Sequence, residues 1–551
     1  MHTSDNQHEA FDYVVVGAGS AGCALVARLT ENSEIRVLLL EAGGDDRVFK
    51  NPSQWQTNVW VGIPAGVAKA MEDPRVNWGY ESIVDEETAR SHVLPRGKIL
   101  GGSSAINGMI YARGHHEDYD QWRDEYGCTG WGWNDVAPVF RRMESNTRGE
   151  DPFHAASGPV TVSDVEPILP ISRIAERACI EAGIPANDDI WGTSPEGVTR
   201  IQLTVKNGRR VSGSTAYLRP AESRNNLCVR TGALVENILF EGKRAVGIAY
   251  RHESQRRVVH ARAEVILCAG TINSPMLLER SGVGDGEQLR GLGIETVHHS
   301  PEVGENLQEH YNASLQYELK PNILTFTQMS RGWGAAKTAL KYLATRRGLM
   351  AGSVGQVVAY AKTDPTLERP DYKILFMLIT ASTQKVRGKH KLVIGAAPGV
   401  TLMTCQLRPE SRGSTHIVNP EADAAPQINP NFLACETDRE VTTKAVRAAV
   451  NIASQPALAE CIARPLTLPE GNPDDAALYA SALKTGHPGH HLSCSCRMGG
   501  DERSVVDPLL RVRGVEGLRV ADCSIMPRLV SGNTNVPAMM IGERASDLIS
   551  K

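Results

Sequence analysis

Two histidines and two cysteines fall close together in the segment "GHHLSCSCRMGG", at positions His490, His491, Cys494 and Cys496. These residue types could bind a metal, form a redox pair of thiols or supply a catalytic base. A tetrahedral zinc site usually takes its ligands from two separated pairs. On a strand, the two cysteines would point to one face, whereas adjacent histidines would point to opposite faces. We therefore predict no metal site.

The two cysteines also lack the features of a redox pair. Redox thiols usually have C-x-x-C spacing at the start of a helix, which lowers the thiol pKa, and "CSC" has neither feature. We expect Cys494 and Cys496 to be small buried groups. A histidine can accept a proton near neutral pH because its ordinary pKa is about 6.5. His490 and His491 both stay candidates for a base on this ground.

The sharpest local motif is "VVVGAGSAGCALVARL", in which Gly17, Gly19 and Gly22 form G-x-G-x-x-G between an expected strand and an expected helix. Such glycines allow a tight turn, the approach of backbone N–H groups to a pyrophosphate, and the packing of helix on strand. Glu41, roughly twenty residues further on, can accept hydrogen bonds from ribose hydroxyls and would repel a 2′-phosphate. The motif predicts a dinucleotide other than NADP, and it does not decide between NAD and FAD.

Residues 11–45 should position this motif as a βαβ unit. The runs "FDYVVVGAG" and "IRVLLLEAGG" are typical of buried parallel strands. Further strands are expected in "RVVHARAEVILCAG" and in "GLRVADCSIMP", and the second of these lies near residue 520. The sheet begun at residue 11 should therefore be completed from the other end of the chain, which leaves the middle to form a second unit. Stretches that contain Pro and Gly near residues 320 and 468 are candidate boundaries.

Composition excludes some partners. The 551 residues are enough for about two to four structural units. With 59 basic and 63 acidic residues the net charge is -4, so the chain offers no global field for nucleic acid. Eleven scattered cysteines favour a reducing compartment. The N-terminal residues have no apolar core of a secretory signal, and residues 1–10 should form a loose tail. We expect a cytoplasmic protein without an integral membrane segment that acts on a small molecule.

The segment "WGAAKTALKYLATRRGLM", residues 333–350, could lie on a membrane surface. Ala336, Leu340 and Leu343 can share one face of a helix there, flanked by basic residues. We expect this helix to pack on its own domain, with peripheral membrane contact as the alternative.

Three longer segments resemble the glucose-methanol-choline (GMC) oxidoreductase family, and choline dehydrogenase-like and alcohol dehydrogenase-like members in particular: "GKILGGSSAINGMIYARG", "GTINSPMLLERSGVG" with "VGENLQEH", and "LRVADCSIMPRLVSGNTNVPAMMIGERASDLI". The resemblance covers nearly the whole chain and is thinnest between about 311 and 400. It implies an α/β (α+β) fold. A Rossmann-like FAD-binding domain would be built from residues 11–310 and 480–551, with insertions near 50–90 and 116–200 on the substrate side. A substrate-binding domain of antiparallel sheet and helices would occupy residues 311–479.

The same resemblance implies which residues meet FAD. The ADP half would contact Gly17, Gly19, Ser20, Gly22, Glu41 and Ala42, with the adenine against the backbone of Val235. The ribityl chain and flavin would contact Gly101, Gly102, Asn107, Gly108, Met109 and Ile110, with Asp522 and Asn533 closing the site. Some family members bind FAD covalently through a histidine, and the matching position here is Ile106. The resemblance therefore implies non-covalent FAD.

The family pattern His-x-x-x-x-x-(Arg/Lys)-Met-Gly, aligned on "RMG", selects His491 as the catalytic base. Its implied companion is Asn535, whose amide could donate to the substrate oxygen without adding a second base. Alternatively, Asn533, Thr534 or Asn535 only caps a helix expected from about Pro537 to Ile549.

The resulting hypothesis is the FAD-dependent oxidation of a primary or secondary alcohol to the carbonyl. His491 would take the hydroxyl proton, hydride would pass to flavin N5, and oxygen or a quinone-type carrier would accept the electrons. The alternatives are a lyase of the hydroxynitrile lyase kind with a non-redox flavin, and a metal- or flavin-binding protein without catalysis. Choline is not favoured as substrate, because a quaternary ammonium needs an aromatic cage and only 5% of the residues are aromatic.

Overall fold

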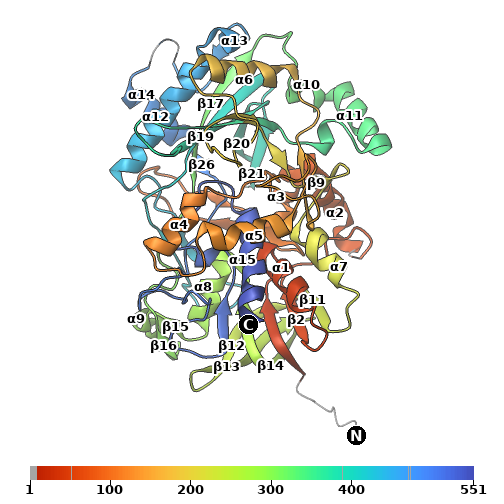
Figure 1. Ribbon diagram of the computed structural model, residues 1–551, viewed down its shortest axis with the longest axis vertical. Coiled ribbons are helices and arrows are strands. Elements are labelled where there is room, and N and C mark those ends of the chain that lie inside the picture. The colour runs from red at the N-terminus through yellow and green to blue at the C-terminus, as the bar shows by residue number, and fades with distance from the viewer. Residues whose placement is uncertain (1–8, 51, 387–388, 470, 472, 551) are drawn as a thin grey trace.

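The computed structural model describes residues 9–50, 52–386, 389–469, 471 and 473–550. Its strands form two large sheets, one at each end of the molecule, and helices from distant parts of the chain cover them (Figure 1). Of the tail expected at residues 1–10, only Glu9 and Ala10 lie among the described residues, and Ala10 begins the first strand.

The first sheet takes its strands from both ends of the chain. Across the sheet the order is β11 (Leu227–Thr231), β2 (Val37–Glu41), β1 (Ala10–Val16), β14 (Gln255–Leu267), β13 (Arg244–His252) and β12 (Leu234–Glu241), and β27 (Leu518–Val520) also pairs with β14. The pairs from β11 to β14 and the β14–β27 pair are parallel, whereas β12, β13 and β14 form antiparallel hairpins. The expected strand, helix and strand of residues 11–45 are present, because apolar runs separated by a glycine turn bury both faces of β1 and β2.

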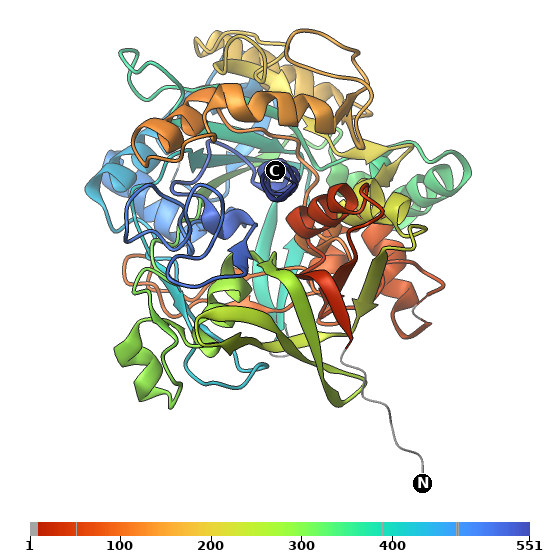
Figure 2. The ribbon, with the colours of Figure 1, turned by 60° about the horizontal axis from the view of Figure 1, so that its bottom comes forward.

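Helices α1 (Ser20–Leu29) and α15 (Asn535–Ile549) lie side by side next to this sheet. Figure 2 shows α15 end-on beside α1. A Cβ added at Gly542 would lie only 2.2 Å from the carbonyl oxygen of Ala21, so the two helices approach backbone to backbone. This contact holds the two ends of the chain together.

The second sheet is antiparallel throughout. Its order is β25 (Ile462–Pro465), β17 (Tyr311–Leu319), β22 (Gly399–Gln406), β19 (Tyr372–Met377), β18 (Gly355–Ala361) and β7 (Gly197–Arg200), and β26 (His487–Pro488) pairs with β17. One face packs against helices α6 (Pro170–Glu181), α12 (Glu436–Ala453), α13 (Pro456–Ala459) and α14 (Asp475–Thr485). Because side chains alternate along a strand, the other face is directed toward the first sheet.

Shorter elements connect and cover the two sheets. The helices are α2 (Trp55–Gly62), α3 (Val67–Met71), α4 (His116–Asp124), α5 (Trp133–Met143), α7 (Arg219–Ala221), α8 (Gly270–Arg280), α9 (Gly286–Gly291), α10 (Phe326–Met329) and α11 (Gly332–Thr345). The strands are β3 (Tyr80–Glu81), β4 (Val93–Leu94), β5 (Glu144–Asn146), β6 (Val160–Asp164), β8 (Gln202–Leu203), β9 (Val205–Lys206), β10 (Arg209–Arg210), β15 (Val283–Gly284), β16 (His298–His299), β20 (Ala381–Val386), β21 (Lys389–Ile394), β23 (Ser414–His416) and β24 (Gln427–Asn429). The exact limits of the expected domains stay a prediction.

Helix α11 differs from its expected packing. It juts from the side of the molecule (Figure 1), and its buried side chain is Tyr342. Leu340 and Leu343, expected to face the domain, are 70% and 67% exposed, and Trp333 is 91% exposed. The face that packs therefore consists mainly of small residues, which hydrophobic periodicity does not reveal. None of the helices in the described ranges is long and apolar enough to cross a bilayer.

Candidate active site

A cavity of about 280 Å³ lies at the carboxyl ends of β1 and β2 and extends to the start of α15. It is lined by most of the residues expected to meet a cofactor: Gly17, Gly19, Ser20, Glu41, Ala42, Gly102, Asn107, Gly108, Met109, Ile110, Val235, Asp522 and Asn533. His491 and Asn535 line it too. Residues from seven separate stretches of the sequence thus meet around one space.

Two of the expected cofactor residues do not line the cavity. A Cβ at Gly22 would lie 2.0 Å from the carbonyl oxygen of Gly17, so Gly22 lets the helix pack against the loop. Gly101 has a left-handed φ of 89°, and its N–H donates to the carbonyl of Ala18. Both glycines support the shape of the loops behind the cavity.

Glu41 ends β2 with a buried carboxylate. Its oxygens accept hydrogen bonds from the N–H groups of Ala18 at 3.0 Å and Gly43 at 2.8 Å. Burial raises the pKa of Glu41 to about 7, and the two hydrogen bonds act against this rise. The carboxylate is thereby fixed at the wall of the cavity, where a ribose hydroxyl could donate to it.

The donor set of the cavity fits an anionic dinucleotide. Helices α1 and α15 both begin at its wall, and neither has a side-chain hydrogen bond at its N-cap, Gly19 or Thr534. The free N–H groups and the positive ends of the two helix dipoles are therefore available to a ligand. Ile106, the residue at the position of the covalent histidine, lines the cavity with a hydrocarbon side chain that cannot form a bond to a flavin.

His491 lies in an irregular segment after β26, not on the strand that we expected. The local pairing is limited to a single bridge between Ser493 and Gln308. Glu309, which follows Gln308 in the chain, accepts hydrogen bonds through its carboxylate from the backbone N–H groups of His491 at 2.6 Å and His310 at 2.9 Å. One buried carboxylate thus fixes the backbone of both histidines.

The hydrogen bonds assign the protons on the two imidazole rings. His310 Nε2 lies 2.9 Å from the carbonyl oxygen of Leu407, which can only accept, so this nitrogen carries the proton. His310 Nδ1 is then an acceptor, and His491 Nδ1, 2.9 Å away, donates to it. His491 Nε2 is left without a proton and accepts from the amide Nδ2 of Asn533 at 2.9 Å. His491 therefore directs a bare nitrogen into the site.

The surroundings keep His491 in its neutral form. Burial is the largest cause, and the neighbouring His310 and Lys373 add to it, so that the pKa of His491 lies well below its usual value of 6.5. A neutral imidazole whose unprotonated Nε2 can take up a proton is the form required of a base.

Asn533, not Asn535, is the asparagine beside His491. Asn535 is the first residue of α15, and its Oδ1 accepts from the hydroxyl of Ser20 at 2.8 Å. Asn533 lies in the loop before the helix, where its Oδ1 accepts from Lys373 Nζ at 3.3 Å. Since an ammonium can only donate, this contact fixes the amide with its Nδ2 toward His491. The geometry does not support the expected pairing of Asn535 with the histidine.

His490 has a different environment. It lines the first cavity, has a left-handed φ of 65°, and its carbonyl accepts from Arg96 at 2.9 Å. Cys494 and Cys496 are fully buried in the apolar core, as expected. Within the described ranges, these four residues do not bring their ligand atoms together as a metal-binding group.

A second cavity of about 80 Å³ adjoins the first. The two share His491, Asn533, Gly489 and Ile110. The second sheet supplies one wall with Val358, Tyr360, Lys373, Leu375 and Met403. His491 and Asn533 therefore stand between a space suited to a dinucleotide and a smaller space suited to a second ligand.

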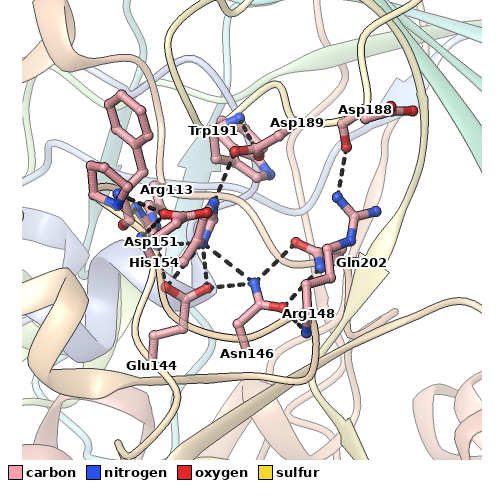
Figure 3. A network of polar contacts seen from close by, with 12 residues as sticks. Arg113, Glu144, Asn146, Arg148, Asp151, His154, Asp188, Asp189, Trp191 and Gln202 are labelled. Carbon is pink, nitrogen blue, oxygen red and sulfur yellow. Dashed lines mark hydrogen bonds and ion pairs between the residues drawn. The ribbon is translucent and has the colours of Figure 1, made fainter.

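Figure 3 shows a polar network around His154, and Arg148, Asp188, Asp189, Trp191 and Gln202 of this network also line the second cavity. His154 contacts Glu144 through Nδ1 and Asp189 through Nε2, each at 2.9 Å. Burial lowers the pKa of His154, but the two carboxylates outweigh it and raise the pKa to about 9. The network is thus a set of mutually neutralised charges that holds the cavity wall rigid.

His310, Glu309 and Lys373 take part in this site without having been identified from the sequence. The first two end "VGENLQEH", a segment that carried the family resemblance, which is a signal that could have found them. Lys373 lies where the resemblance is thinnest, so no motif pointed to it.

Comparisons with known proteins identify the family of this chain. Family models for GMC oxidoreductase match residues 11–312 and residues 409–542. An oxygen-dependent choline dehydrogenase from Burkholderia thailandensis is 38% identical over 550 residues, covering 98% of this chain and 94% of that protein. An alcohol dehydrogenase [acceptor] from Pseudomonas putida is 36% identical, covering 98% of this chain and 95% of that protein.

Solved structures share the whole fold. Pyridoxine 4-oxidase from Mesorbium loti has a TM-score of 0.85 at 29% identity, with 98% of both chains covered. Formate oxidase from Aspergillus oryzae, studied for modification of its FAD, has a TM-score of 0.88 at 22% identity with the same coverage. The expected mixed helix and sheet fold is thereby confirmed. FAD is the cofactor of this family, as expected, and the cavity described above fits it. The chain belongs to the GMC oxidoreductase family.

Proposed function

We propose that this oxidoreductase uses non-covalently bound FAD to oxidise a primary or secondary alcohol to a carbonyl compound. The observation that carries the proposal is the position of His491, whose unprotonated Nε2 faces the boundary between the two cavities. The glycine loops, Glu41 and the starts of α1 and α15 would hold the dinucleotide in the first cavity. Bound FAD would supply the acceptor for the hydride that leaves the alcohol carbon.

The residues of the second cavity would then prepare the alcohol. An alcohol oxygen placed between Asn533 and His491 would donate its proton to His491 Nε2 and accept from Asn533 Nδ2. His310, which accepts from His491 Nδ1 at 2.9 Å, would keep the ring in the required tautomer and orientation. His310 is therefore proposed as a positioning residue, and Asn533 replaces Asn535 as the proposed companion of the base.

The choice between the two adjacent histidines can be tested directly. In the His491→Ala variant, FAD should remain bound, but anaerobic reduction of the flavin by an alcohol should slow by roughly 10²- to 10⁴-fold, the usual contribution of a general base. His490→Ala is the matched control, because that side chain makes no contact with Asn533 among the hydrogen bonds of the described residues. A flavin-loaded His491→Ala protein with full activity would disprove the proposal.

The same experiment separates oxidation from lyase chemistry on this fold. An oxidised alcohol bleaches the flavin in the absence of oxygen, whereas a lyase substrate leaves it yellow. Repeating the reaction with oxygen and with a quinone identifies the acceptor, for which the two named relatives suggest different answers. The cytoplasmic location inferred from composition is part of this proposal.

A further inference from the structure

Lys373 is a buried cation at the wall of the second cavity. Only 6% of the residue is exposed, and its Nζ has one hydrogen bond, to Asn533 Oδ1 at 3.3 Å. In the part of the chain that the structure describes, no carboxylate lies within ion-pair distance of this ammonium. Among the described residues, two of its three N–H donors thus lack an acceptor.

The register of the second sheet explains why this cation faces the site. Lys373 pairs directly with Tyr360 on one side and Cys405 on the other, and Cys405 pairs with Asn312. Directly opposite residues place their side chains on the same face of a sheet. These four side chains therefore form one row across the face that looks toward His491. The row holds one cation and no carboxylate.

The middle of the next row on the same face is apolar, with Thr199 and Ser314 at its two ends. Val358, Leu375 and Met403 are mutual neighbours two residues further along their strands, and all three line the second cavity. The two aspartates of the cavity do not offset Lys373, since Asp189 is paired with His154 and Asp188 is exposed at the edge. Two arginines also line the cavity, but Arg148 is paired with Asp164 and Arg200 with Glu176. Among the described residues of the lining, Lys373 is therefore the one lysine or arginine without an ion-pair partner, and it lies beside apolar side chains of the sheet.

The charge of Lys373 determines which class of alcohol the second cavity can bind. A buried charge without a partner is unfavourable, and a ligand that supplies an anionic oxygen forms a charge-assisted hydrogen bond with it. A quaternary ammonium group, by contrast, would meet a like charge, and the two lining carboxylates are either paired with His154 or exposed at the edge. The chemistry of this row is therefore opposite to what a choline-like alcohol requires.

We propose that the second cavity binds an alcohol with an apolar body and a carboxylate, and that Lys373 is the residue that recognises the carboxylate. The inference rests on the proposed function, because it assigns the substrate class of the same site. Lys373 also holds Asn533 by its oxygen, so the ligand's anionic group and its hydroxyl would be aligned through the same two side chains.

Binding can be tested without turnover. Benzoate should perturb the flavin absorbance of the holoenzyme and raise its melting temperature, whereas benzyltrimethylammonium should do neither. In Lys373→Met, benzoate affinity should fall roughly 10- to 100-fold, the usual effect of losing one charge-assisted hydrogen bond. Lys373→Arg should retain most of the affinity. Lys362→Met is the matched control, because Lys362 lies just beyond the end of β18 and pairs with Glu196 outside the cavity.

Turnover gives the second measurement. The ratio of kcat/KM for the best of the 2-, 3- and 4-(hydroxymethyl)benzoates to kcat/KM for benzyl alcohol should exceed one in the unmodified enzyme. The ratio should drop roughly 10- to 100-fold in Lys373→Met and stay unchanged in Lys362→Met. A preference for choline, or an equal loss for charged and neutral alcohols in Lys373→Met, would overturn the inference.

The two proposals fail in different ways. If benzyl alcohol reduces the flavin but benzoate does not bind, the carboxylate inference is wrong and the proposed function stands. If benzoate binds through Lys373 but no alcohol reduces the flavin, the proposed function is wrong and the anion site stands. Should Lys373→Met fail to fold, comparing the binding of benzoate and of benzyltrimethylammonium to the unmodified holoenzyme still shows whether the cavity prefers an anionic or a cationic ligand.

Discussion

Replacing each of the two asparagines before the last helix separates a catalytic amide from a structural one. Asn533 Nδ2 donates to His491 Nε2 at 2.9 Å, where an alcohol oxygen would take up the same donor. Asn535 instead accepts from the Ser20 hydroxyl at 2.8 Å. Asn533→Ala is therefore expected to lower the rate of flavin reduction, whereas Asn535→Ala is expected to lower the stability of the protein.

The magnitudes follow from these contacts. Removing one donor from a developing oxyanion costs about 10²- to 10³-fold in kcat, which is about 2.7 to 4 kcal/mol. Asn533→Ala should show this loss and keep its flavin. Asn535→Ala loses one neutral hydrogen bond, worth about 1 kcal/mol of stability. Its melting temperature should fall by about 2 °C, and its rate should change by less than about 5-fold.

The assay is anaerobic stopped-flow reduction of the flavin by saturating benzyl alcohol, with flavin content and melting temperature measured on the same samples. Reporting rates per bound flavin removes any effect of cofactor loss. If Asn535→Ala were the slower variant by an order of magnitude while fully loaded with flavin, the assignment of Asn533 to the substrate oxygen would be wrong.

Two further predictions concern the base and the helix contact. Burial and neighbouring cations hold the pKa of His491 well below 6.5, and the pKa of buried Glu309 is raised to about 7. On the acid side, kcat/KM for a neutral alcohol should therefore fall below about pH 7 and level off by about pH 8; an acid limb with its midpoint above pH 7.5 would contradict this. In Gly542→Ala, the added Cβ would lie 2.2 Å from the Ala21 carbonyl oxygen, so α15 must shift and unfolding should become easier by about 1 to 3 kcal/mol with faster loss of FAD. Denaturant unfolding with and without added FAD measures the free energy of unfolding of Gly542→Ala and the part of it that FAD contributes. Gly291→Ala is the control, because an added Cβ meets open space there.

Local patterns predicted the parts of the site that local chemistry determines. The glycines around Gly17 specify a turn between strand and helix, so β1, α1 and the cavity residues beside them lie as the spacing suggested. The asparagine pair was harder, because the residue that faces the base depends on where α15 begins. The helix begins at Asn535, which commits that side chain to α1 and leaves Asn533 in the loop.

Contacts between distant residues were not predictable from the sequence. His310 and His491 are 181 positions apart, and they meet because β26 pairs with the start of β17 and a bridge between Gln308 and Ser493 continues that pairing beyond the two histidines. The role of Lys373 depends on the register of four strands, and a shift of one residue would turn it to the opposite face. The packing of α11 is a similar case, since small residues form its buried face.

The contact between α1 and α15 also determines when, during synthesis of the chain, the cofactor cavity can be completed. The loop of Gly17 is made early, but the cavity that it opens into has no wall on the side of Asn533 and Asn535 until more than 500 further residues have left the ribosome. During that time the apolar strands β1 and β2 lack the helix that finally lies beside α1. Such exposed surface is what chaperones bind. We therefore expect the cofactor to enter a nearly complete chain, and we expect a chain that ends before residue 533 to hold it more weakly, because the residues from Asn533 to Asn535 form part of the cavity wall.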